Sequence, residues 1–101
     1  MVSWTVTDVA NSASHTVGVD DVVILAGHSS TITLPTLAAG RMLVVKDKSG
    51  AAATSGQAIT INRAGSATID GSNTSFSLNA NYGAVMFIAG NGTEWHTIAL
   101  V

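Results

Sequence analysis

Thr31-Ile32-Thr33-Leu34 alternates polar and apolar side chains, and this two-residue period decides the fold class. The same alternation recurs at 59–62 (Ile-Thr-Ile-Asn) and at 75–78 (Ser-Phe-Ser-Leu). Because successive side chains of a β-strand point to opposite faces, each segment predicts a half-buried strand with its threonine and serine side chains in solvent. No window shows the apolar spacing of an amphipathic helix, so the chain is predicted to be all-β.

Two further segments are apolar on both faces. They are Val22-Val23-Ile24-Leu25 and Met42-Leu43-Val44-Val45. This composition is typical of a strand that is covered on both sides. The segments therefore predict central strands, or strands whose second face is covered by another subunit.

Glycine-containing turn signals separate the predicted strands. Asp70-Gly71 and Asn91-Gly92 favour tight hairpins, and the spacing of the signals is typical of sandwiches and barrels. We expect a single β domain over 1–101, a small antiparallel β-sandwich or barrel (jelly-roll-like) of about eight to ten short strands. The expected strands are 4–9, 15–17, 21–25, 30–34, 41–47, 58–62, 67–69, 75–78, 83–89 and 94–99. Residues 1–12 form either the first strand or an N-terminal arm.

The chain is poor in charge for its apolar content. Of its 101 residues, 47% are hydrophobic and 10% are charged, whereas a typical soluble domain has about 25% charged residues. A domain of this size cannot bury all of its apolar side chains. Some of this surface is therefore expected to contact a partner or another copy of the chain.

Charge and composition also exclude several classes of partner. The net charge is −2 and no basic block exists, which argues against nucleic-acid binding. The chain has no cysteine, so disulfides and thiolate metal sites are excluded.

The N-terminus does not resemble a signal peptide, and the longest apolar run, 84–89, is too short to cross a membrane. We expect a soluble product that stays in the cytoplasm where it is made and has no membrane partner.

The sequence contains no arrangement of residues that is typical of an enzyme. The Gly-x-Ser-x-Gly motif of serine hydrolases is absent. His15, His28 and His96 lack the close spacing of zinc ligands. Asp20 and Asp21 are adjacent, so a strand would point them to opposite faces rather than pair them for acid–base chemistry. We expect no catalysis and no bound metal or cofactor.

The aromatic residues offer one candidate binding site. Phe76 and Phe87 fit the inward positions of strands and are predicted to lie in the core. Tyr82 and Trp95 have two interpretations: a shallow surface platform next to polar side chains, as glycan-binding proteins use, or packing in the core or between subunits.

From Thr31 to His96 the sequence resembles a β module of tailed-phage virion proteins. The matching segments include Thr31-Ile32-Thr33-Leu34-Pro35, Gly40-Arg41, Leu43-Val44-Val45-Lys46-Asp47, Thr68-Ile69-Asp70-Gly71, Tyr82-Gly83-Ala84-Val85 and Gly92-Thr93-Glu94-Trp95. They follow the order of the family's motifs, which are a strand ending in Leu-Pro, a "G-R-x-L-x-V-K-D" strand, a "T-I-D-G" turn and a "Y-G-x-V … G-x-x-W" hairpin.

The resemblance implies a homotrimeric, all-β virion component. Such modules occur in capsid decoration or cement proteins, head fibres, tail fibres and tailspikes, and the short chain favours a decoration protein that stabilises a phage head. The implied partners are further copies of the chain and the major capsid protein, on the outer capsid surface of a virion assembled in the host cytoplasm. Val2, Trp4 and Val6 would anchor the N-terminal arm to a capsid-protein sheet. The alternative is a receptor- or glycan-binding module of a tail fibre or tailspike.

Overall fold

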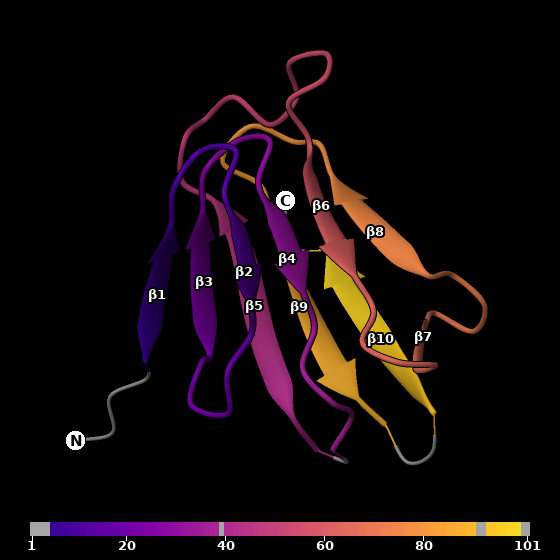
Figure 1. Cartoon of the computed structure of the whole chain (residues 1–101). Coiled ribbons are helices and arrows are strands. Elements are labelled where there is room, and N and C mark those ends of the chain that lie inside the picture. Colours follow the sequence, from indigo (N-terminus) through magenta and orange to yellow (C-terminus); the bar gives the residue numbers. More distant parts are fainter. Residues whose placement is uncertain (1–4, 39, 91–92, 100–101) are drawn as a thin grey trace.

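The computed structural model of the chain describes residues 5–38, 40–90 and 93–99 (Figure 1). The described residues form ten strands and no helix, so the predicted all-β class is confirmed. None of them could therefore belong to a helix that spans a membrane. The strands are β1 (Val6–Val9), β2 (Ser14–Thr16), β3 (Val23–Ala26), β4 (Thr31–Thr33), β5 (Met42–Asp47), β6 (Ile59–Asn62), β7 (Thr68–Ile69), β8 (Ser75–Leu78), β9 (Ala84–Ala89) and β10 (Glu94–Ala99).

The strands form two mixed sheets that enclose one core. Sheet A has the strand order β1-β3-β5-β9-β10-β7, and sheet B has the order β2-β4-β6-β8. Figure 1 shows the sheets as two layers, with the connections between them gathered at the two ends of the strands.

The first six strands alternate between the two sheets. β1, β3 and β5 are parallel neighbours in sheet A, while β2, β4 and β6 are parallel neighbours in sheet B. The chain thus winds around the core in coils, each with one strand in either sheet. The later strands complete the sheets in the opposite sense, because β9 pairs antiparallel with both β5 and β10, and β8 pairs antiparallel with β6.

The predicted antiparallel arrangement is wrong. Five of the eight strand pairs within the described ranges are parallel, and this winding is not that of a jelly roll, whose strands are antiparallel. The prediction assumed that strands adjacent in sequence also pair. Among the first six strands, however, each turn carries the chain across the core to the other sheet. Turn residues signal a change of direction but do not specify which sheet the next strand joins.

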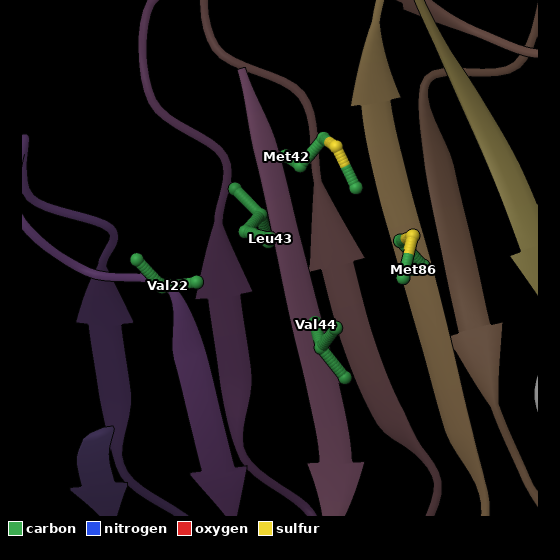
Figure 2. A pocket seen from close by; sticks show the side chains of 5 residues that line it. All are labelled: Val22, Met42, Leu43, Val44 and Met86. Carbon is green, nitrogen blue, oxygen red and sulfur yellow. The ribbon is translucent and has the colours of Figure 1, made fainter. Parts of the chain in front are cut away.

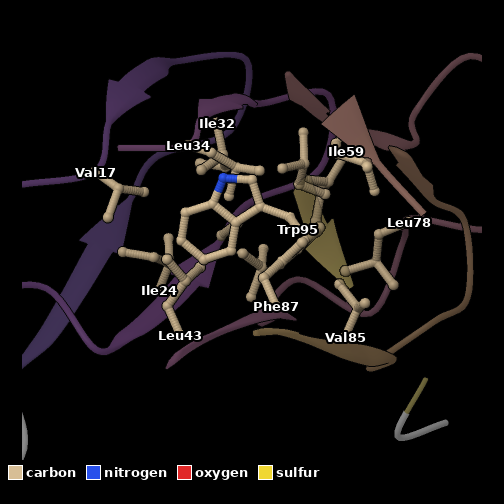
Figure 3. Packing of buried hydrophobic residues seen from close by; sticks show 14 of the residues in the cluster. Val17, Ile24, Ile32, Leu34, Leu43, Ile59, Leu78, Val85, Phe87 and Trp95 are labelled. Carbon is tan, nitrogen blue, oxygen red and sulfur yellow. The ribbon is translucent and has the colours of Figure 1, made fainter. Parts of the chain in front are cut away.

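Alternate residues of both sheets fill the core, as Figure 3 shows for ten labelled side chains. Ile24, Leu43, Val85 and Phe87 come from sheet A, and Ile32 and Ile59 come from sheet B. Phe87 is fully buried and contacts Phe76 edge to face, with ring centroids 5.9 Å apart. This geometry is favourable for aromatic pairs, so the Phe76–Phe87 contact links β8 of sheet B to β9 of sheet A.

Asp47, the last residue of β5, is a buried carboxylate that ties two loops together. Its Oδ1 accepts hydrogen bonds from the backbone N of Ser49 at 2.9 Å and from the Ser49 hydroxyl at 2.6 Å. Its Oδ2 accepts from the backbone N of Ala52 and of Tyr82, both at 3.1 Å. Burial alone would raise the pKa of Asp47, but these hydrogen bonds outweigh it and hold the pKa below its ordinary value.

Asp21 holds the turn that leads from β2 to β3. Its carboxylate accepts hydrogen bonds from the Thr7 hydroxyl at 2.6 Å and from the backbone N of Gly18 at 2.8 Å, and it lies 2.9 Å from His15 Nε2. The Arg41 guanidinium donates to the backbone oxygens of Gly18 and Asp21. Burial raises the pKa of Asp21, but the hydrogen bonds from Thr7, Gly18 and His15 and the charge of His15 lower it overall, from 3.8 to about 2.

Replacing Phe87 by alanine is expected to lower the free energy of unfolding by about 3–5 kcal/mol, because a buried ring leaves a cavity. Urea unfolding followed by circular dichroism measures the change. The control is Val19→Ala, since Val19 is exposed in the turn after β2 and should change stability by less than about 0.5 kcal/mol. Equal unfolding midpoints for the two variants would contradict the described core.

The contribution of Asp21 to the free energy of unfolding is expected to be lost in acid. Because its pKa in the folded state lies below the unfolded value of 3.8, the contribution is complete above that pH and is lost as the pH falls towards 2. Its size is about 2 kcal/mol. Thermal unfolding at a series of pH values should show that Asp21→Asn is less stable at neutral pH and depends less steeply on pH in this window. Parallel pH profiles for the two proteins would disprove this role.

Candidate assembly surface

Outward side chains of sheet A form an apolar row across five neighbouring strands. The strand register aligns Val6, Val23, Val44, Met86 and Ile98. On the three central strands of this row, the residues next to it in sequence are buried, so the row points away from the core. The row explains the two apolar runs at 22–25 and 42–45, whose second face lies here.

Two shorter rows flank this one. Met42, Ile88 and His96 are aligned on one side, and Asp8, Leu25, Lys46 and Ala84 on the other. We call the outward apolar residues of the three rows the apolar face; it consists of Val6, Val23, Leu25, Met42, Val44, Ala84, Met86, Ile88 and Ile98. Val6, Met42 and Ile98 are 53%, 48% and 46% exposed, so about half of each of these side chains is in water.

Charged side chains lie at the margins of the apolar face. Asp8 and Lys48 form an ion pair of 3.1 Å, and His96 Nε2 lies 3.5 Å from Glu94 Oε1. Exposed pairs of this kind add little to folding stability. An apolar centre with a polar rim is the arrangement that protein interfaces have.

A shallow hollow lies within the apolar face. It has a volume of about 200 Å³ and is lined by Val22, Met42, Leu43, Val44 and Met86. Figure 2 shows Met42 and Val44 on β5 and Met86 on β9 around it. Methionine side chains are flexible and adapt to the shape of a partner, so the hollow is suited to receiving an apolar side chain rather than a polar substrate.

The outer face of sheet B has the opposite character. Its register aligns Ser14, Thr31, Thr60 and Ser77 in one row, and Thr16, Thr33, Asn62 and Ser75 in the next. Hydroxyl and amide groups are readily solvated, so this face needs no partner. The two outer faces therefore differ, and the unusual one is the apolar face of sheet A.

The residues of the predicted N-terminal arm, and those of the predicted aromatic platform, have different locations in the structure. Val2 and Trp4 lie outside the described residues, whereas Val6 is in β1, which pairs with β3, and belongs to the apolar face. Tyr82 is 62% exposed, but Trp95 is fully buried in the core (Figure 3). The prediction of a surface platform from Tyr82 and Trp95 is therefore wrong, and core packing is correct for Trp95.

The polar residues considered for chemistry are also dispersed. His15 contacts Asp21, His28 contacts Ser29, and His96 contacts Glu94. Within 5–38, 40–90 and 93–99, the structure brings together no group of three side chains suited to a metal ion. The Arg41 guanidinium donates to two backbone oxygens and braces the turn before β3.

Sequence reasoning detected parts of the apolar face but not the face itself. The runs 22–25 and 42–45 were recognised as apolar on both sides. Met86 lies in the apolar run 84–89, which was assessed only for its length, and Ile98 gave no separate signal. Their place depends on strand register, which joins residues far apart in sequence.

The comparisons with known proteins assign no relative. No protein-family model matches the chain, and a search of the curated proteins finds no match. The resemblance to phage virion modules therefore stays a prediction from the sequence motifs.

Proposed function

We propose that the chain is a structural virion protein, a capsid decoration or cement protein that self-associates as a homotrimer and stabilises a phage head. The apolar face of sheet A is the observation that carries this proposal. The sequence motifs between Thr31 and His96 supply the virion and trimer assignments.

The composition supports self-association through this face. Apolar side chains span five strands there, while only 10% of the chain is charged. Burying apolar surface contributes roughly 25 cal/mol per Å², and a second copy brings a surface of the same chemistry. The rim charges, which include Asp8 and Lys46, stay at the edge of such a contact and limit nonspecific aggregation.

Attachment to a head would use a different surface. In this proposal residues 1–4, which precede β1 in sequence, would pair with an edge strand of the major capsid protein, because main-chain hydrogen bonds give affinity with little demand on sequence. Val2 and Trp4 are the proposed anchors. Val6 is assigned instead to the contact between copies, since it belongs to the apolar face.

Met86→Lys is expected to convert the trimer into a monomer. The substitution places an ammonium group in the centre of the apolar face and should weaken association by about 30-fold or more, because burying an unpaired charge costs at least about 2 kcal/mol. Sedimentation equilibrium gives the mass. Thr60→Lys, at an outward position of a central strand in sheet B, is the matched control and should remain a trimer. A monomeric wild-type protein, or a trimeric Met86→Lys variant, would refute the assembly role of this face.

Capsid binding tests the other half of the proposal. The wild-type protein should cosediment with empty heads built from the major capsid protein of the source phage and raise their melting temperature. Deleting residues 1–4 should reduce cosedimentation while the trimer persists, because β1 begins at Val6 and is left intact. Heads that do not bind the wild-type trimer would exclude the decoration role, and full binding by the deletion variant would exclude the arm.

The alternative function, a receptor- or glycan-binding module of a tail fibre or tailspike, is favoured by one observation. Tyr82 is the most exposed aromatic side chain among the described residues. Assembly through sheet A would leave the end of the sandwich that carries Tyr82 accessible.

A further inference from the structure

Tyr82 combines high exposure with an uncommon backbone conformation. It precedes β9 and has a φ of 55°, a region that residues other than glycine, asparagine and aspartate seldom adopt. Such strain persists only where neighbouring contacts impose it, and it occurs often at ligand-binding sites. The fold therefore holds an exposed aromatic ring in a strained backbone position, as ligand-binding sites often do.

Three contacts fix Tyr82 in place. Its backbone N donates to the buried Asp47 carboxylate, its backbone oxygen accepts a hydrogen bond from Lys46 Nζ, and its ring lies against Gly50. A Cβ atom at Gly50 would fall 2.4 Å from Tyr82 Cζ, so only glycine allows this approach. Asp47 also binds Ser49, and hence the same carboxylate positions both the ring and the loop on which it rests.

Two donor side chains occur near Tyr82: Lys46 Nζ lies over its ring, and Asn81 is its neighbour in sequence. Lys46 Nζ is 5.8 Å from the ring centroid and carries two N–H groups besides the one it gives to the Tyr82 oxygen. Asn81 Oδ1 accepts from the backbone N of Ala53 at 2.9 Å, which fixes the amide whose NH₂ group is a donor. The site thus combines an exposed aromatic ring, the Lys46 ammonium and the Asn81 amide.

We propose that Tyr82, Lys46 and Asn81 bind a pyranose ring that carries a carboxylate, as in an acidic glycan. The apolar C–H face of the sugar would pack on the Tyr82 ring, its carboxylate would face the Lys46 ammonium, and a hydroxyl would accept from Asn81. A cationic ligand is disfavoured because Lys46 repels it. Asp47 and Gly50 are positioning residues, since they hold the ring without reaching the ligand. The proposal does not depend on assembly through sheet A.

A glycan array with neutral, amino-sugar and uronic- or sialic-acid oligosaccharides tests the proposal on the wild-type protein. Acidic glycans should bind in preference to their neutral counterparts, and saturation-transfer NMR should place the sugar protons next to a tyrosine ring. An array without binding, or one with neutral glycans alone, would overturn the assignment.

Variants then locate the site. Tyr82→Asn suits the backbone conformation but removes the ring, and should weaken binding of the strongest acidic glycan by about tenfold. Tyr82→Phe keeps the ring and should bind like the wild type, while Lys46→Gln should lose the preference for acidic over neutral sugars. Gly50→Ala should weaken binding by displacing the ring. Wild-type affinity in Tyr82→Asn would refute the site, and an unchanged oligomeric mass in each variant separates this result from the assembly proposal.

Discussion

The strand register of the most apolar strands of sheet A needs support from the rest of the structure. A slip by one residue exchanges the two faces of a strand, and its cost depends on how different those faces are. In β6 the slip would put threonine in the core and isoleucine in water, so the register is strongly specified. In β9 a slip would replace the valine and phenylalanine in the core by methionine and isoleucine. The free-energy difference between the two registers is therefore smaller for β9. A short crossing links β3 to β4 of sheet B, and Asp47 at the end of β5 accepts hydrogen bonds from Ser49, Ala52 and Tyr82. These links limit slippage of the apolar strands. The apolar face can therefore exist without loss of a unique fold.

The local structure was predictable because each strand carries its own signal. The segments 31–34, 59–62 and 75–78 alternate cleanly, and each contains an observed strand. The order of the strands within the sheets was not predictable, because it depends on whether a turn returns the chain to the same sheet or carries it across the core. Glycine occurs in both kinds of turn: Gly27 lies between β3 and β4, which are in different sheets, and Gly90 lies between β9 and β10, which are in the same sheet. The all-β class therefore followed from the sequence, whereas the parallel winding required the structure.

The candidate sites were also predictable only in part: local alternation was visible in the sequence, whereas burial and contacts between distant residues were not. Alternation places Trp95 and Thr97 on one face of β10 but does not say which face is the core, so the sequence favoured core or subunit packing for Trp95 and left a surface platform as the alternative. Asp47 lies between Lys46 and Lys48 in sequence, yet it is buried and organises the loops around Tyr82. Burial of a carboxylate depends on donors from residues as distant as Tyr82, which composition cannot reveal. Tyr82 lies in a turn before β9 and is exposed, as turn residues commonly are.

The winding of the first six strands has a consequence for the order of folding. Each new coil of β1 to β6 can settle on the one before it as the chain leaves the ribosome, since every parallel partner lies upstream. β5 then keeps one unpaired edge until β9 has been synthesised. During this interval its main-chain groups and apolar side chains are open to any nascent neighbour on the same messenger RNA, and such edges are where misassociation starts. Asp47 and Lys46 at the end of β5 place charge beside this temporary edge, as natural edge strands commonly do.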